Sequence, residues 1–147
     1  NICLTNIKLY DLLDSYTAYE TLDTDNQWKC DKCNIRVNCV KKIHFWRLSP
    51  VLIIIIKKYN LISKIKKNID YPFILNMRNY CADYFGDNLK YKLIGVCVHQ
   101  GELNGGHYWS MCKKYDNWYK YNDNNVSLIK DINDVKNGDA YALIYRR

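Results

Sequence analysis

Proline and glycine are scarce in this chain, with two and six residues among 147. This scarcity excludes collagen-like and Pro/Gly-rich disordered proteins, in which these residues make up roughly a quarter of the chain or more. Long apolar runs are also missing. The most apolar stretch, VLIIII at 51–56, is far shorter than the roughly 20 residues of a membrane-spanning helix. We therefore expect a globular protein without a membrane partner.

Signals for secretion and for a disulfide scaffold are absent as well. The first residues, NICLTNIKLYDLL, lack a basic leader followed by an apolar run. The seven cysteines are an odd number at irregular spacing, so we expect free thiols and a cytoplasmic or nuclear location. The chain begins without an initiator Met, which leads us to expect a fragment of a longer protein.

Acidic residues are fewer than basic ones. The chain has 15 Asp and Glu against 22 Lys and Arg, which gives a net charge of +7. Such an excess raises the question of a nucleic-acid partner. The lysines concentrate in KKYNLISKIKK at 57–67, which is typical of a solvated basic loop. No RNA-binding signature accompanies the 14 tyrosines and 4 tryptophans, so we expect no nucleic-acid partner.

Hydrophobic periodicity predicts an α+β fold with a dominant antiparallel sheet. Apolar residues at 9, 12, 13, 16 and 19 favour one amphipathic helix over 7–20, and 128–135 favours one or two helical turns. The continuous apolar run after Pro50 is typical of a strand in the middle of a sheet covered on both faces. Strands or extended segments are expected at 35–48, 51–59, 71–77, 90–101, 108–114, 117–123 and 140–147.

The stretch ELNGGHYWSM at 102–111 places two glycines directly before a histidine. Strands joined by a tight turn at 115–117 would bring His107 beside Asn122 and Asp123. A histidine that faces an amide or a carboxylate is the base-and-orienter part of a nucleophilic site. We expect that partner to hold the Nδ1–H group and leave Nε2 to take a proton. The alternative is an ordinary loop that enters a strand.

Gly105 and Gly106 lack Cβ atoms, so their backbone allows unusual dihedral angles and the close approach of an extended substrate. His44 and His99 fall within predicted strands and are expected to be structural.

The cysteines show no signature of a nucleophile. Cys97 and Cys112 sit within predicted strands among apolar neighbours, which favours packing roles. Cys3, Cys39 and Cys81 also lack the Gly/Asn turn and following helix that usually surround an activated thiolate. The sequence thus contains a candidate base without a candidate nucleophile.

Five segments follow one another in a fixed order: CDKC at 30–33, LSPVLIIIIKKY at 48–59, YKLIGVCVHQGELNGGHY at 91–108, WYKYNDNNV at 118–126 and AYALIY at 140–145. Together they resemble the C-terminal half of the catalytic domain of ubiquitin-specific proteases, over nearly all of the chain. The resemblance implies a papain-like cysteine protease half-domain with an antiparallel palm sheet and part of a zinc-finger-type β ribbon, the fingers. Residues 1–45 would contain the helix and fingers portion, and 46–147 the palm.

The resemblance also implies roles for individual residues. His107 matches the family's catalytic histidine, and Asn122 matches its third catalytic residue, which is Asp or Asn. Asp123 matches the adjoining acid, which can assist or substitute. The implied activity is that of a deubiquitinating cysteine protease, a hydrolase with ubiquitin or ubiquitinated proteins as partners.

Substrate-binding residues follow from the same likeness. The loop 100–106 corresponds to one that borders the channel for the C-terminal Gly-Gly tail of ubiquitin. Gly105, Gly106 and Tyr108 are the residues that we expect to meet this tail. The lysine-rich segment 57–67 does not suit a basic tail, so we expect it to face away from the channel.

A structural zinc ion is implied for the intact protein, and no organic cofactor. Cys30 and Cys33 match one of the family's two CxxC pairs. Structural zinc is normally four-coordinate, so this chain holds half a site, unless Cys39 or another ligand joins.

Several features of the family are missing. The Gly-Asn-Thr-Cys turn that opens a helix, and the oxyanion-hole Asn near it, are not in this chain. We therefore expect the isolated chain to be inactive. Ser49 replaces the first Pro of the family's strand motif, and Ile55 replaces a frequent His, which should affect packing only. The alternative function is an inactive module that binds ubiquitin or another partner.

Overall fold

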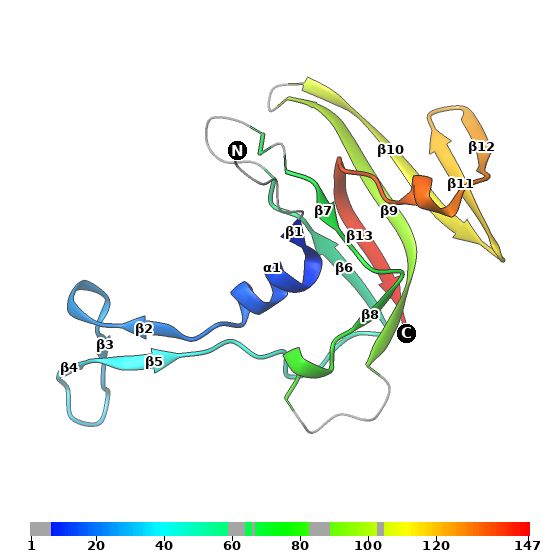
Figure 1. Ribbon diagram of the computed structural model, residues 1–147. Helices are drawn as coiled ribbons and strands as arrows, with labels where there is room; N and C mark the ends of the chain where they lie inside the picture. Colours follow the sequence, from blue (N-terminus) through cyan, green and yellow to red (C-terminus); the bar gives the residue numbers. More distant parts are fainter. Residues whose placement is uncertain (1–6, 59–63, 66, 83–88, 103–104) are drawn as a thin grey trace, which may run out of the picture.

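A computed structural model describes residues 7–58, 64–65, 67–82, 89–102 and 105–147. Its central element is a seven-stranded sheet in which every pairing is antiparallel (Figure 1). The order is β12-β11-β10-β9-β13-β6, with β8 paired to β9 beside this path. The strands are β6 (Val51–Ile55), β8 (Ile74–Asn76), β9 (Lys90–Glu102), β10 (Gly105–Lys114), β11 (Asn117–Asn122), β12 (Asn125–Ile129) and β13 (Ala140–Arg146).

Two tight hairpins connect β10, β11 and β12. Lys114 pairs with Asn117 and Asn122 pairs with Asn125, so each connection has two residues. The first residue of each connection, Tyr115 and Asp123, has a positive φ of 54° and 50°. Two-residue hairpin loops favour such dihedrals because they match the twist of the strands.

The N-terminal part forms a narrow ribbon that extends away from the sheet (Figure 1). It consists of two antiparallel pairs, β2 with β5 and β3 with β4. The remaining elements are β1 (Ile7–Lys8), α1 (Leu9–Tyr16), β2 (Glu20–Leu22), η1 (Thr24–Asn26), β3 (Trp28–Lys29), β4 (Arg36–Val37), β5 (Cys39–Lys41), β7 (Ile69–Asp70), η2 (Arg78–Tyr80) and η3 (Ile132–Val135).

The hydrophobic core lies against one face of the sheet, here called the inner face. Leu9 and Leu13 of α1 belong to the same buried cluster as alternate residues of the long strands. The inner face is defined by Leu75, Tyr91, Leu93, Val96, Val98, Met111, Trp118, Leu143 and Tyr145. No helix in the described residues is both long and apolar enough to cross a membrane.

The predicted α+β class is correct, but several boundaries differ. The helix predicted over 7–20 occupies only Leu9–Tyr16. It ends at Thr17, whose backbone leaves the helical region with φ −102° and ψ 8°, while its hydroxyl and its amide donate to the Leu13 carbonyl at 2.9 and 3.0 Å. Tyr16 and Tyr19, predicted on its apolar face, are 57% and 72% exposed.

The long strand predicted at 35–48 is wrong. Residues 36–37 and 39–41 pair with two different short strands, β3 and β2, so alternation there does not mark one continuous strand. His44 consequently lies outside any strand and is exposed. Strand β12 was not predicted, because its last residues, Leu128 and Ile129, were assigned to the helical turns expected over 128–135. Only Ile132–Val135 of that segment forms a helical turn.

The strand after Pro50 forms as predicted, but not in the middle of the sheet. Within the described residues β6 pairs with β13 alone, at the end of the strand order. Its inner-face residues contribute to the core, whereas Ile53 and Ile55 are 69% and 57% exposed. One side of this apolar strand is therefore covered and the other is not.

Tyr71 provides a test of the core. Its buried hydroxyl donates to the Val135 carbonyl at 2.7 Å and accepts from the Asn137 amide at 2.9 Å. We expect Tyr71→Phe to lower the free energy of unfolding at pH 7 by about 1–3 kcal/mol, measured by urea denaturation. Tyr115→Phe is the control, because Tyr115 is 87% exposed and should change nothing.

Wild type and Tyr71→Phe also test how stability depends on pH. Burial raises the pKa of Tyr71 to about 12, so its neutral form is favoured in the folded state. The stability that it adds is complete below the unfolded pKa of about 10 and declines as the pH rises above it. The difference between wild type and Tyr71→Phe should thus shrink by about 1 kcal/mol at pH 11. A constant difference would contradict this assignment.

Candidate active site

His107 and Asn122 meet at one end of the β10–β11 hairpin. Ser110 pairs with Tyr121, so Trp109 lies opposite Asn122, and His107 is one diagonal step away on the same face. The Nε2 atom of His107 makes a hydrogen bond with Asn122 Oδ1. The turn geometry that predicted this meeting therefore brings the two side chains together.

Asp123 lies next to the same nitrogen. Its Oδ2 atom is 3.7 Å from His107 Nε2, and its side chain is 76% exposed. An ion pair so exposed is strongly screened by water. Asn122 is thus the direct partner of the imidazole, and Asp123 is a second acceptor just beyond hydrogen-bond distance.

The predicted roles of the two ring nitrogens are reversed. Asn122 Oδ1 contacts Nε2 rather than Nδ1. The diagonal separation explains this, because Nε2 is the ring nitrogen farther from the backbone and reaches across to the neighbouring strand. An amide oxygen can only accept, so this contact requires the hydrogen on Nε2, which in a neutral imidazole leaves the lone pair on Nδ1. The imidazole side chain is 47% exposed.

The two glycines before His107 differ in the space that surrounds them. A Cβ atom at Gly105 would meet nothing within 4 Å, so this position is open. A Cβ atom at Gly106 would overlap the imidazole of His99 and the carbonyl of Gln100. Gly106 is therefore required by the chain's own packing, a reason that the sequence pattern did not indicate.

His99 and Tyr108 form an aromatic cluster on the opposite face from His107. The two rings are tilted by 43° with centroids 4.4 Å apart, and the Tyr108 ring packs edge-on against Tyr141 at 5.8 Å. His99 is buried, in keeping with a structural role, and Tyr108 is 53% exposed. Tyr108, one of the predicted substrate-binding residues, thus has its side chain on the opposite face of the sheet from His107.

None of the cysteines in the described part of the chain lies beside His107. Cys112 follows it by five residues on the same strand, and Cys97 pairs with Ser110. Both therefore point to the other face of the sheet. Cys81 is buried beside Phe45, and this burial raises the pKa of its thiol. Cys3 lies outside the described residues.

Two lysines of the predicted solvated loop are in fact buried. Lys58 and Lys64 are 4% and 8% exposed. Lys64 Nζ donates to the His99 carbonyl at 2.8 Å and pairs with Asp139 Oδ1 at 3.0 Å, while Lys58 Nζ donates to the Gly138 carbonyl. Desolvation lowers the pKa of Lys58.

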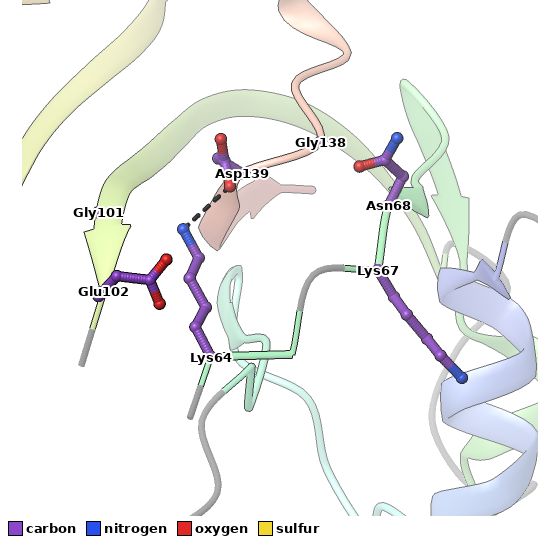
Figure 2. Close-up of a pocket in the computed structure, with 7 residues that line it drawn as sticks. All are labelled: Lys64, Lys67, Asn68, Gly101, Glu102, Gly138 and Asp139. Atoms are coloured by element: carbon purple, nitrogen blue, oxygen red, sulfur yellow. Dashed lines mark hydrogen bonds and ion pairs between the residues drawn. The ribbon is translucent and has the colours of Figure 1, made fainter. Parts of the chain in front are cut away.

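Lys64 borders a cavity of about 300 Å³ at the end of β9, which Lys67 also lines (Figure 2). Lys64 points inward toward Asp139, and Glu102 lies across from it, whereas Lys67 points away toward α1. Glu102 pairs with Gly105 in the hairpin that carries His107. Lys64 therefore links β9, through the His99 carbonyl, to Asp139 just before β13. The expectation that its side chain is solvated was wrong.

Cys30 and Cys33 form a tight turn in the ribbon. The Asn34 amide donates to the Cys30 carbonyl and the Cys30 amide to the Ile35 carbonyl, with Asn34 at a φ of 55°. Hydrogen bonds from the backbone of Cys33, its side chain and the backbone of Lys32 lower the pKa of Cys30. A lowered pKa favours the thiolate, which is the form of cysteine that binds a metal ion.

The ribbon nevertheless brings only these two cysteines together. The described residues contain no group of three or more His, Cys, Asp or Glu side chains placed to hold a metal ion. Cys39 lies in β5, where it pairs with Leu22 of β2. Its participation as a third ligand has no support in this geometry.

Comparison with known proteins identifies the family. The family model for ubiquitin carboxyl-terminal hydrolases matches residues 17–145, which is most of the chain. This chain belongs to the ubiquitin carboxyl-terminal hydrolase family. The resemblance drawn from the five sequence segments is thereby confirmed.

Curated relatives of this chain are much longer than it is. A probable ubiquitin carboxyl-terminal hydrolase of Acanthamoeba polyphaga mimivirus is 37% identical over 149 residues, which cover 96% of this chain and 32% of the relative. Ubiquitin carboxyl-terminal hydrolase 8 of Saccharomyces cerevisiae is 35% identical, with 94% and 32% coverage. The chain spans about a third of the length of these two relatives.

Solved structures share the fold. A SAGA DUB module containing Ubp8 and bound to monoubiquitin matches with a TM-score of 0.83 and 35% identity, over 97% of this chain and 33% of that chain. A second structure of the module, bound to ubiquitin aldehyde, gives 0.82 and 34%, over 97% and 34%. The α+β, papain-like half-domain is confirmed. The boundary at residue 45 stays a prediction.

The two glycines provide the next test. We expect Gly106→Ala to destabilise the hydrolase chain by about 1–3 kcal/mol, because the added methyl group must displace the His99 ring or the Gln100 carbonyl. Gly105→Ala, one residue away in open space, should stay within about 0.5 kcal/mol of wild type. Urea denaturation of both variants measures this, and equal effects would refute the packing assignment.

Thiol reactivity tests the turn at Cys30. The hydrogen bonds that lower the pKa of Cys30 contrast with burial, which raises the pKa of Cys97. Because the thiolate is the reactive form, alkylation of Cys30 should reach half of its maximal rate at a lower pH than alkylation of Cys97. Mass spectrometry after iodoacetamide pulses, with a chelator present, gives both profiles. Coincident midpoints would show that the turn does not stabilise the thiolate.

Proposed function

We propose that this chain supplies the histidine-bearing part of a deubiquitinating cysteine protease, which hydrolyses the bond after the C-terminal glycine of ubiquitin. The observation that carries the proposal is the hydrogen bond between His107 and Asn122, on neighbouring strands of a rigid sheet. Relatives named as ubiquitin carboxyl-terminal hydrolases, and similar structures bound to ubiquitin, support it.

In this proposal His107 acts as the general base. The Asn122 oxygen holds the Nε2–H group, so the Nδ1 lone pair faces the reacting thiol. Nδ1 accepts the thiol proton, and the thiolate attacks the carbonyl carbon of the terminal glycine. The resulting imidazolium then protonates the leaving lysine amine. Water, deprotonated by the same nitrogen, hydrolyses the thioester and regenerates the thiol.

The nucleophile comes from a segment that is not among these 147 residues. Cys97 and Cys112 face away from His107, and Cys81 is buried elsewhere. The relatives contain about two thirds of their length outside the matched stretch, which is ample for a nucleophile-bearing unit. The isolated chain should therefore show no hydrolysis.

Two finer roles belong to the same proposal. The open position at Gly105, on the same face as His107, suits the passage of ubiquitin's thin Gly-Gly tail. Gly106 and Tyr108 pack with His99 on the opposite face, so contact of these two residues with the tail gains no support from this geometry. Cys30 and Cys33 would hold a structural zinc ion together with two ligands from elsewhere in the protein. The ion would then stabilise the tip of the ribbon and take no part in the reaction. The cytoplasmic or nuclear location and the absence of a nucleic-acid partner stay predictions.

The experiment uses a chimera in which this chain replaces the matched third of the mimivirus relative. The chimera is mixed with ubiquitin that has a thiol-reactive electrophile at its C-terminus, and the intact mass is recorded. We expect one ubiquitin adduct on a cysteine outside this chain. His107→Ala should slow its formation by at least about 10³-fold. His44→Ala is the matched control, because His44 is exposed and lies outside any strand.

Asn122 and Asp123 are compared in the same assay. Asn122→Ala should be the more harmful substitution, because Asn122 makes the direct hydrogen bond while Asp123 lies 3.7 Å away. Equal losses from Asn122→Ala and Asp123→Ala would contradict this order. Ubiquitin binding without an adduct would favour the alternative of an inactive binding module. Turnover by the isolated chain, blocked by thiol alkylation, would place the nucleophile within it.

A further inference from the structure

Next to the His107–Asn122 pair, the inner face of the sheet holds a second side-chain pair with the same geometry. Lys120 pairs with Met111, which places it diagonally across from Trp109 on the neighbouring strand. His107 and Asn122 are related by the same diagonal step. The Lys120 ammonium lies over the Trp109 ring, with Nζ 4.1 Å from the ring centroid. Within the described residues no carboxylate pairs with Lys120, so the indole is the group that holds its charge.

The indole of Trp109 is held from two directions on the neighbouring strands β9, β10 and β11 (Figure 1). Trp109 is 9% exposed and belongs to the buried core cluster. Its Nε1–H group donates to Gln100 Oε1 at 3.2 Å, and Gln100 is the residue directly opposite His107 on β9. Burial and this hydrogen bond fix the plane of the indole. One face of the ring is therefore available to the Lys120 ammonium, as a cation–π contact requires.

Without this ring, the Lys120 ammonium would have two acceptors within reach. Asn122 follows Lys120 by two residues on β11, so its carboxamide lies on the same face of the sheet. The oxygen of this carboxamide is the atom that contacts His107 Nε2. The second acceptor is the Asp123 carboxylate, 3.7 Å from the same nitrogen. A lysine side chain that turned to either acceptor would bring a positive charge beside the imidazole.

A cation at this place would harm the candidate site in two ways. Hydrogen bonds from charged donors are stronger than those from neutral donors, so the ammonium would take the Asn122 oxygen from the imidazole. His107 would then lose the acceptor that fixes its hydrogen on Nε2. In addition, a neighbouring like charge would disfavour the imidazolium that forms when the ring accepts the thiol proton.

We propose that Trp109 is a positioning residue for the His107–Asn122 pair. Its indole retains the Lys120 ammonium and so keeps the Asn122 oxygen for the imidazole. Trp109 thus acts through Asn122 and not on the reacting atoms. The effect on the reaction rate rests on the proposed function. The effect on the imidazole does not, because it concerns contacts within this chain alone.

The position of the imidazole hydrogen is the first measurement. In the neutral ring, the nitrogen NMR shifts give the fraction of His107 that carries its hydrogen on Nε2, and His107→Ala identifies the signals. We expect a complete Nε2–H form in the wild-type chain and in Trp109→Phe, which keeps an aromatic face for the ammonium. Trp109→Leu should shift the ring toward a mixture of both neutral forms. Addition of Lys120→Met to Trp109→Leu should restore the Nε2–H form.

The rate of ubiquitin adduct formation by the chimera is the second measurement. Trp109→Leu should slow it by about tenfold, because the imidazole loses one hydrogen bond. The double variant Trp109→Leu with Lys120→Met should return to within about threefold of wild type, because both changes act through one contact. Lys114→Met is the matched control in the Trp109→Leu background. Lys114 is an exposed lysine at the far end of β10, so its removal should restore nothing.

Gln100→Met provides the same test if the loss of a buried ring prevents folding. Gln100 is exposed, so this substitution leaves the core intact, yet it removes the acceptor that orients the Trp109 indole. We expect a smaller loss of the Nε2–H form and a slowing of adduct formation by about threefold, both reversed by Lys120→Met. Cooperative unfolding of each variant in urea shows that its sheet is intact.

The outcomes separate this inference from the proposed function. Loss and restoration of the Nε2–H form without any ubiquitin adduct would support the role of Trp109 and refute the protease. An adduct whose slowing in Trp109→Leu and Gln100→Met persists after Lys120→Met would support the protease and refute the inference, because packing alone would then explain Trp109. A mixture of ring forms already in wild type, or a complete Nε2–H form in every folded variant, would refute the inference as well.

Discussion

The pairing of β9 with β10 determines the position of nearly everything else in the structure. Eight residue pairs connect Glu102 with Gly105 at one end and Gly95 with Cys112 at the other. The remaining strands are added on both sides of this hairpin, β11 beside β10 and β13 beside β9. A shift of one residue in this register would turn His107 to the other face of the sheet.

The end of the hairpin near His107 is held from both sides. Gly106 leaves just enough room for the buried His99 ring, so the two strands approach closely there. Behind them, Lys64 binds the His99 carbonyl and Asp139, while the His99 amide donates to the Asp139 carbonyl. The backbone that carries the candidate base is therefore fixed before any substrate arrives, which is what a precise proton transfer needs.

The sequence predicted the parts of this arrangement that depend on local pattern. Alternation identified the long strands, and the turn after Lys114 was enough to bring His107 to Asn122. Features that depend on tertiary contacts were not predictable. Lys64 and Lys58 look like any lysine of a basic loop, and only the position of Gly138 and Asp139 makes them buried donors. Gly106 looked like a substrate-facing residue, although its neighbour is His99.

The apolar run VLIIII shows how a correct observation can lead to a wrong position. Its composition rightly indicated a strand with apolar residues on both faces, and the inference of a central place in the sheet followed from that. In the structure, the strand is an edge, and its outer side chains lack a cover within the described residues. Apolar side chains on both faces and a central position in the sheet are separate properties, and the sequence pattern reports only the first.

An edge strand of this composition has a consequence for the chain in solution. Within the described residues, β6 offers one unpaired row of backbone amide and carbonyl groups beside exposed isoleucines. Short, β-branched segments without charge or proline are the ones that stack into intermolecular sheets. The strand that completes the sheet is thus also the segment through which separate copies of the chain would associate into fibrils.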